Sequence, residues 1–241
     1  MTVFVLVHGA WHGPWAWDRV TPLLRRAGAH AITPALPLEA HAGLHVHADH
    51  VVAVLDALAA DGHEPDGGIG DVVLVGHSYA GLVVRQAADQ RPHLVDHVVL
   101  VDGWAGSDGV SLFDLAPEWL VTALRDAAGD GKTVPPPPPA AFGITEPADA
   151  EWLAPRLVPQ ALSTFTEATR LTGAVDRIPG TGIHCRPGTY PFDRFAAELG
   201  YRSHALDGPH DVMLSHPEAL TRLLLQAAAE PADSENEKST I

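Results

Sequence analysis

Short apolar runs alternate with helix-like segments over most of the chain. Continuous apolar runs are typical of strands that a sheet buries on both faces. Between them, apolar residues recur at helical spacing, as at Leu220, Leu223 and Leu224. This alternation predicts a mainly parallel α/β sheet with helices on both faces, and such sheets bind ligands at the carboxyl ends of their strands. The predicted strands are 3–7, 30–33, 72–75, 97–101, 181–185 and 202–206, and the predicted helices are 18–27, 47–60, 82–90, 191–199 and 216–229.

The alternation stops between Trp104 and about Val175. This segment contains helix-like pieces but no convincing sheet strand, and it includes five consecutive prolines at 135–139. Prolines form a stiff link that packs poorly, and an aromatic-rich insertion at the carboxyl edge of a sheet is typical of a lid over a mostly apolar pocket. We expect a helical lid, with extra packing against the domain as the alternative. The aromatic residues are Trp104, Phe113, Trp119, Phe142, Trp152 and Phe165.

A chain of 241 residues is long enough for one large domain with a single core. Residues 61–70 are rich in Gly and Asp and are expected to form a loop. The polar end of the chain is expected to fray. The predicted organisation is a core of residues 1–103 and 176–229, a lid insertion of residues 104–175, and a tail of residues 230–241.

A serine lies where a predicted strand meets a predicted helix, in Gly76-His-Ser-Tyr-Ala-Gly81. The sequence reads G-x-S-x-A, and its small flanking residues Gly76 and Ala80 avoid clashes that a larger side chain would cause in a tight turn. The N-terminus of the following helix favours a negatively charged oxygen nearby. Ser78 is therefore a candidate nucleophile, and the alternative is a buried serine that caps the helix.

A serine needs a base that accepts its proton, and the base needs a third group that orients it. Among 15 histidines, His210 is the best candidate, because it lies in the turn between the last predicted strand and the last predicted helix. That turn belongs to the same edge of the sheet as Ser78. A histidine on the surface without a chemical role is the alternative.

Taken together, three loops resemble those of the α/β-hydrolase superfamily, at residues 8–13, 76–81 and 208–211. The chain most resembles its compact bacterial esterase-like members, relatives of plant methyl-ester hydrolases and hydroxynitrile lyases, whose chains also open on a Val-His-Gly-Ala strand. The resemblance implies the α/β-hydrolase fold, with Ser78 as nucleophile and His210 as base. It also implies an oxyanion hole formed by the backbone N–H groups of Ala10 and Tyr79.

The acid of the expected triad departs from the plant pattern. In those relatives an aspartate follows the penultimate strand, but Gly188 occupies that place here. Other branches, haloalkane dehalogenases among them, carry the acid after the strand that follows the nucleophile helix. That position is Asp102, which we assign as the acid, with Asp193 or Asp207 as alternatives. Asp211 adjoins His210, and such neighbours are poorly placed to bond the Nδ1 atom of the ring.

The resemblance also disfavours two activities. Hydroxynitrile lyases of this group have a threonine in the first loop and a lysine after the histidine, where this chain has Gly9 and Asp211. Haloalkane dehalogenases have an aspartate as nucleophile at the place of Ser78. Hydrolysis of an acyl group is therefore favoured.

The expected function is hydrolysis of a small, largely apolar ester or lactone through an acyl-enzyme on Ser78, with His210 as base. Trp11, Tyr79 and Trp104 are expected to line the substrate pocket. Two alternatives keep the pocket without the hydrolysis. One is a cyclase or decarboxylase of a natural-product pathway, and the other is a small-molecule receptor.

Composition argues against nucleic acid and membranes as partners, and a small-molecule substrate remains the expected partner. The formal net charge of −15 repels nucleic acid and anionic lipid, and no run approaches the length of a membrane span. Cys185 is the single cysteine, so no disulfide within the chain is expected. The short apolar run at 3–7 is interpreted as a strand and not as a signal peptide, which makes a cytoplasmic location the expectation. The protein is expected to be a monomer or a homodimer.

No cofactor or metal is expected. His41, His45, His47 and His50 cluster after the second predicted strand, but no cysteine or carboxylate set accompanies them at ligand spacing. The stretch 129–133 ends like a phosphate-binding loop, yet it lacks the first glycine and a preceding strand. The loop histidines His12 and His77 are expected to hydrogen-bond the backbone.

Overall fold

One parallel sheet forms the centre of the computed structural model, which describes residues 1–62, 70–129 and 131–229. Within these residues its six strands run parallel in the order β2-β1-β3-β4-β7-β8. The predicted fold class is confirmed. The predicted tail at 230–241 and most of the predicted loop at 61–70 lie outside the described residues. The strands are β1 (Val3–Val7), β2 (His30–Ile32), β3 (Val72–His77), β4 (His97–Val101), β7 (Gly180–Arg186) and β8 (Arg202–Asp207).

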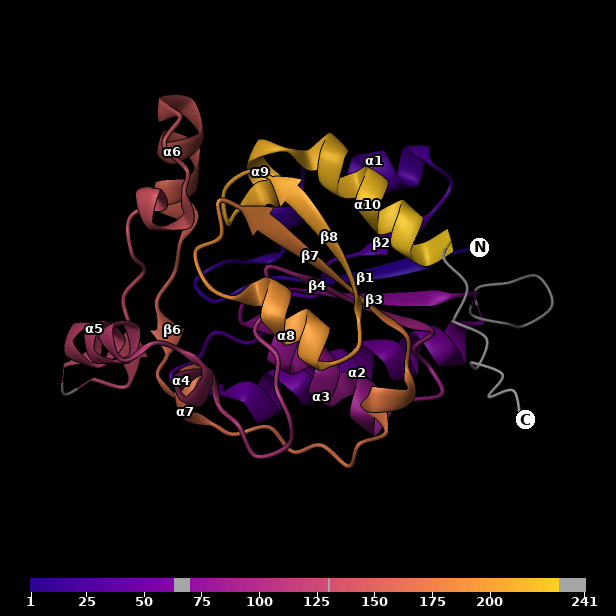
Figure 1. The fold of residues 1–241 in the computed structure, drawn as a ribbon, viewed down its shortest axis with the longest axis horizontal. Helices are drawn as coiled ribbons and strands as arrows, with labels where there is room; N and C mark the ends of the chain where they lie inside the picture. The colour runs from indigo at the N-terminus through magenta and orange to yellow at the C-terminus, as the bar shows by residue number, and fades with distance from the viewer. Residues whose placement is uncertain (63–69, 130, 230–241) are drawn as a thin grey trace, which may run out of the picture.

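Helices cover both faces of this sheet (Figure 1). The first face carries α2 (Leu44–Asp61), α3 (Ala80–Gln90) and α8 (Phe192–Glu198). The second face carries α1 (Thr21–Arg26), the short α9 (Val212–Ser215) and α10 (Pro217–Ala229). The sheet is therefore the middle layer of three.

Strand β1 shows how the sheet divides the interior into two cores. All five of its residues are fully buried, and successive side chains of a strand point to opposite faces. Val3, Val5 and Val7 pack on the side of α2 and α3, whereas Phe4 and Leu6 pack on the side of α1 and α10. A continuous apolar run is thus required because both faces of the strand are covered.

The segment between β4 and β7 stands to one side of the sheet, on the left of Figure 1. Its two short strands pair antiparallel in a small sheet of their own, although the sequence shows no convincing sheet strand in this segment. Strands of two residues show no alternation that a sequence pattern could reveal. The elements are α4 (Leu112–Leu115), α5 (Glu118–Ala128), β5 (Thr133–Val134), α6 (Pro147–Leu153), β6 (Gln160–Ala161) and α7 (Ser163–Thr166), with 3-10 turns at Pro139–Phe142, Ala154–Arg156 and Val175–Arg177.

Helices α1 and α2 begin three residues away from their predicted starts. Helix α2 begins at Leu44 and not at 47, because the carboxylate of Glu167 accepts the backbone N–H of His45 at 3.1 Å. A carboxylate there satisfies one of the unpaired donors of the first turn. Helix α1 begins late because the preceding residues form a 3-10 turn at Pro14–Trp17, which a proline at its first position favours. In the described parts of the chain, no helix is long and apolar enough to cross a membrane.

Candidate active site

Ser78 lies in a tight turn between β3 and α3. Its backbone has a φ of 53°, in the left-handed region that side chains other than glycine rarely adopt. Its N–H donates to Val101 at 3.1 Å, and its carbonyl accepts the N–H of Trp104 at 3.0 Å. A Cβ atom at Gly76 would lie 2.5 Å from the carbonyl oxygen of Ala80, so the turn requires glycine there. The strand, the turn and the helix together hold the Ser78 hydroxyl at the edge of the sheet.

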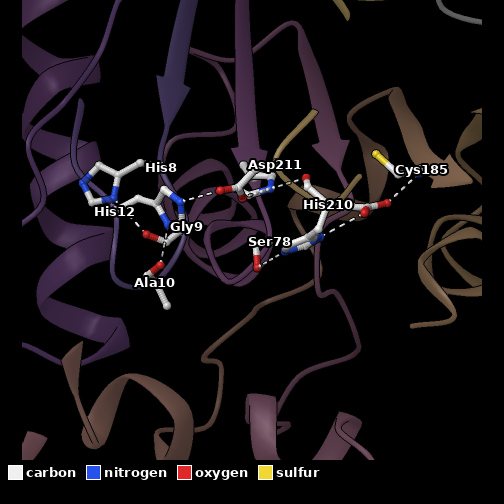
Figure 2. A network of polar contacts seen from close by, with 10 residues as sticks. His8, Gly9, Ala10, His12, Ser78, Cys185, His210 and Asp211 are labelled. Atoms are coloured by element: carbon white, nitrogen blue, oxygen red, sulfur yellow. Dashed lines mark hydrogen bonds and ion pairs between the residues drawn. The ribbon is translucent and has the colours of Figure 1, made fainter. Parts of the chain in front are cut away.

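The side chains of Ser78, His210 and Asp102 form one hydrogen-bonded line. Ser78 and His210 are labelled in Figure 2. The Ser78 hydroxyl is 3.0 Å from Nε2 of His210, and Nδ1 of His210 is 3.0 Å from Oδ2 of Asp102. The other oxygen of Asp102 accepts the backbone N–H of Cys185 at 2.7 Å. A carboxylate held in this way fixes the tautomer that donates from Nδ1 and leaves Nε2 to accept a proton.

The two alternative acids lie elsewhere. Asp207 is 81% exposed and pairs with Arg186 at 2.9 Å, and Asp193 lies on the exposed side of α8. Asp102 is 1% exposed, and its φ of 43° bends the chain after β4 so that the carboxylate faces His210. The structure therefore brings together the three residues that the resemblance implies.

Aromatic and apolar groups enclose this line of contacts. The ring of Phe192 stacks on the ring of His210, with 5.6 Å between centroids and 13° between planes. The His210 side chain is 10% exposed and lines the cavity. Burial, together with the charge of Asp102, raises the pKa of the Cys185 thiol, which is therefore neutral. A neutral thiol behind Asp102 adds no second negative charge to the site.

The loop after β1 carries Ala10, a predicted oxyanion-hole residue. Nδ1 of His8 donates to the carbonyl of Gly9 at 3.0 Å, and Nδ1 of His12 donates to the carbonyl of Ala10 at 2.7 Å (Figure 2). The N–H of a trans peptide points away from its carbonyl. Because His8 holds the Gly9 carbonyl on one side, the Ala10 N–H is directed to the other. Ala10 lines the same cavity as Ser78, His210 and the other predicted oxyanion residue, Tyr79.

The buried histidines around the site differ in charge. Burial lowers the pKa of His8 to about 3 and that of His77 to about 3, so both rings are neutral at pH 7. Burial would also lower the pKa of His12, but the charge of Asp211, 2.9 Å away, raises it above its ordinary value. Burial would raise the pKa of Asp211, and the charge of His12 lowers it. His12 and Asp211 therefore form a buried ion pair.

Both loop histidines bond the backbone, as expected. His12 bonds the carbonyl of Ala10, and Nε2 of His77 donates to the carbonyl of His210 at 3.0 Å. His12 also makes a second bond that the sequence does not predict, from Nε2 to Asp211. No signal in the sequence suggests this bond, because the burial that makes a partner for Asp211 necessary is a property of the folded chain.

The cavity beside Ser78 has a volume of about 510 Å³. All three predicted pocket residues, Trp11, Tyr79 and Trp104, line it. The Tyr79 hydroxyl is 2.8 Å from Nδ1 of His47, whose Nε2 donates to the carbonyl of Pro37 at 2.8 Å, so this hydroxyl is already paired. The remaining wall comes mainly from the segment between β4 and β7: Leu112, Trp119, Leu120, Ala123, Leu124, Ala127, Val134, Pro135, Pro136, Pro137, Ala141, Phe142 and Phe165, with Thr189 and Tyr190 from the loop before α8.

Within the described parts of the chain, no Asp, Glu, Lys or Arg side chain lines the cavity. A charged group placed in this cavity would lose its hydration without gaining an ionic partner from these lining residues. Among the described residues, no group of three or more His, Cys, Asp or Glu side chains could hold a metal ion.

The chain is similar to known proteins over most of its length. A model of the alpha/beta hydrolase family matches residues 4–223. The chain belongs to this family. It is 31% identical to the carbendazim hydrolyzing esterase of Nocardioides sp. (strain SG-4G), over 93% of this chain and 98% of that esterase. It is 33% identical to the probable esterase PIR7A of Oryza sativa, over 74% of this chain and 66% of the rice protein.

Solved structures agree on the fold of this hydrolase. An extracellular alpha/beta-hydrolase from a Paenibacillus species, said to share structural and functional homology with tobacco salicylic acid binding protein 2, superposes with a TM-score of 0.82. That match has 22% identity and covers 95% of this chain and all of the other. With esterases as its relatives, the hydrolase is a carboxylic-ester hydrolase, which favours hydrolysis over the cyclase, decarboxylase and receptor alternatives.

Proposed function

We propose that this carboxylic-ester hydrolase cleaves small, largely apolar esters or lactones through an acyl-enzyme on Ser78. The observation that carries the proposal is the unbroken line from Ser78 through His210 to Asp102, with 3.0 Å at each contact. A base at this distance can accept the hydroxyl proton as the oxygen attacks a carbonyl carbon.

In the first half of the reaction, the Ser78 oxygen forms a bond to the ester carbonyl carbon while its proton passes to Nε2 of His210. The carbonyl oxygen gains the negative charge, and the backbone N–H groups of Ala10 and Tyr79 donate to it. When the intermediate collapses, the bond to the leaving oxygen breaks, and His210 returns the proton to that oxygen. The alcohol leaves, and the acyl group remains on Ser78.

In the second half, a water molecule gives a proton to His210 and attacks the acyl carbon. The second intermediate collapses to the carboxylic acid and the free serine, which takes back its proton. Asp102 stays ionised throughout and stabilises the imidazolium that forms in each half. The contact with Phe192 helps to keep the ring of His210 in place during both proton transfers.

The cavity wall supports the choice of substrate. A volume of about 510 Å³ suits a molecule of modest size, and aromatic and aliphatic side chains form most of its surface. We include in the proposal that the segment at 104–175 acts as a lid, since most of the wall belongs to it. The substrate in the name of the Nocardioides relative, carbendazim, is accordingly a useful member of a test panel.

The proposal is tested with a fluorophosphonate probe followed by peptide mass mapping. We expect the probe to label Ser78, and we expect Ser78→Ala to abolish labelling and to lower kcat on short-chain esters by at least about 10⁴-fold. Ser111→Ala is the matched control, because that serine is buried but caps α4. Ester hydrolysis by Ser78→Ala at a rate within tenfold of the unaltered protein would overturn the proposed mechanism.

A further inference from the structure

Trp11 connects the loop after β1 to the segment between β4 and β7. Its N–H donates to Oε1 of Gln160 at 3.0 Å, and its indole Nε1 donates to the carbonyl of Val134 at 3.2 Å. Its carbonyl accepts the N–H of Val158 at 3.0 Å. Each of the three polar atoms of Trp11 is therefore bonded to that segment, at or beside its small β5-β6 sheet.

The backbone of Trp11 needs such support. Its φ of 64° lies in the left-handed region, which is a rare conformation for a bulky side chain and persists only where the surroundings enforce it. The peptide between Ala10 and Trp11 is held at both ends, with its carbonyl on Nδ1 of His12 and its N–H on Gln160. These two bonds fix the residue that follows Ala10 and so restrict the rotation of Ala10 itself.

Hydrogen bonds at both ends of its amide fix the side chain of Gln160. It is 2% exposed, and its Nε2 donates to Oγ1 of Thr164 at 2.8 Å, which orients the amide so that Oε1 faces Trp11. Thr164 is fully buried and bonds onward to the carbonyl of Ala42 at 3.4 Å. A buried amide with partners at both ends is a rigid support, because breaking either bond would leave a polar group unpaired.

We propose that Gln160 is a positioning residue for the oxyanion hole, acting through Trp11 on the N–H of Ala10. The inference rests on the proposed function, because it takes the Ala10 N–H as a donor to the developing negative charge. Trp11 and Val134 also line the substrate cavity, and Trp11 packs on Phe165 with 5.2 Å between ring centroids. The segment that covers the substrate thus also holds the loop that stabilises charge.

Gln160→Met removes the acceptor while keeping the length of the side chain. We expect kcat to fall about tenfold to a hundredfold and KM to change less than about threefold. A misplaced donor weakens the stabilisation of the transition state more than the binding of the substrate. Gln86→Met is the matched control. Gln86 is also 2% exposed, and its Oε1 also accepts a backbone N–H at 3.0 Å, from Arg170, but it does not contact the loop after β1.

A pair of inhibitors separates positioning from general damage. A phenylalkyl trifluoromethyl ketone forms an adduct whose oxygen needs the oxyanion hole, whereas the matching methyl ketone binds without the adduct. We expect Gln160→Met to raise the inhibition constant of the trifluoromethyl ketone about tenfold or more and to leave that of the methyl ketone unchanged. Gln160→Glu keeps an acceptor oxygen for Trp11 and should recover part of the loss. Gln86→Met should leave both constants unchanged.

The outcomes distinguish this inference from the proposed function. If Ser78→Ala retains hydrolysis, the proposed function fails and the inference fails with it. If Ser78→Ala is inactive while Gln160→Met keeps both kcat and the ratio of the two inhibition constants, only the positioning role is wrong. If Gln160→Met does not fold, Thr164→Val provides the measurement, since it removes the partner that orients the amide. We expect the same direction of change, and an unchanged ratio in that variant also overturns the role.

Discussion

His12 and Asp211 form a buried ion pair with 2.9 Å between Nε2 and Oδ2, although 199 positions separate them in the chain. His12 belongs to the loop after β1, and Asp211 belongs to the loop after β8 that also carries His210. His77, from the end of β3, donates to the backbone of the same loop. The three loops that carry Ala10, Ser78 and His210 are thereby joined to one another.

Asp211→Asn should reduce both stability and activity. The substitution removes the charge that raises the pKa of His12, so the ring becomes neutral and one of its two donated bonds is lost. We expect the free energy of unfolding to fall by about 3 kcal/mol, as is typical when one partner of a buried pair is removed. Urea denaturation at pH 7 measures this loss, and kcat on a short-chain ester measures the effect on the Ala10 loop.

The double variant His12→Asn/Asp211→Asn shows whether the pair acts as a unit. If the two side chains depend on each other, the double variant should lose at least about 1 kcal/mol less than the sum of the single variants. Strict additivity would mean that each side chain contributes independently and would contradict the ion pair.

Asp102→Asn should lower kcat by about 10³-fold to 10⁴-fold, because an amide no longer stabilises the imidazolium of His210. Asparagine tolerates the left-handed backbone conformation found at this position, so the fold should be retained. The measurement is steady-state kinetics on one ester, with Asp193→Asn and Asp207→Asn as controls at exposed positions. A loss confined to either control variant would assign the acid to that residue instead.

Acid should destabilise the protein below pH 6.5. Burial lowers the pKa of both His8 and His77 from 6.5 to about 3, so the neutral rings favour the folded state above pH 6.5. As the pH falls from 6.5 towards 3, the unfolded chain binds protons that the folded chain excludes. Each histidine then removes up to about 1.4 kcal/mol of unfolding free energy per pH unit.

Urea denaturation at pH 7, 6 and 5 tests this dependence. His8→Asn keeps a donor for the Gly9 carbonyl, but asparagine cannot titrate. The unfolding free energy of this variant should therefore decrease with falling pH less than that of the unaltered protein does, by up to about 1.4 kcal/mol per pH unit. Parallel pH profiles for the variant and the unaltered protein would show that His8 is not responsible.

The uncharged cavity should discriminate against anionic substrates. A methyl ester with a free carboxylate on its acyl chain should have a kcat/KM at least about 100-fold below that of its neutral isostere, because the carboxylate loses hydration without a partner. Leu120→Arg places a cation in the wall and should raise kcat/KM for the anionic ester at least about tenfold. Thr122→Arg adds the same charge to the exposed side of α5, outside the cavity. This control variant should leave kcat/KM unchanged for both esters. Equal rates on both esters would contradict the apolar pocket.

The sequence predicts the parallel sheet and the residues at its edge because both follow from local signals. Apolar runs define the strands, and parallel strands place the loops with Ser78, Asp102 and His210 at one edge whatever the details of packing. The boundaries of α2 could not be predicted in this way. Its first turn depends on Glu167, which comes from a segment far along the chain.

No local sequence signal marks the residues that hold the active-site loops in place. Gln160 belongs to no motif, and its contact with Trp11 spans 149 positions. The small sheet that carries Gln160 consists of two strands of two residues, too short for any period. The charge on His12 depends on its burial with Asp211, which only the folded chain defines. Specific side-chain contacts across long stretches of sequence are thus what the sequence alone leaves undetermined.

The three bonds between Trp11 and the segment at 104–175 limit how this enzyme can be engineered. Grafting the corresponding segment of another hydrolase would exchange the walls of the cavity and would also remove the partners of Trp11. Residues 134, 158 and 160 therefore need to be transplanted or kept as a set, whereas cavity residues on α5 can be varied one at a time.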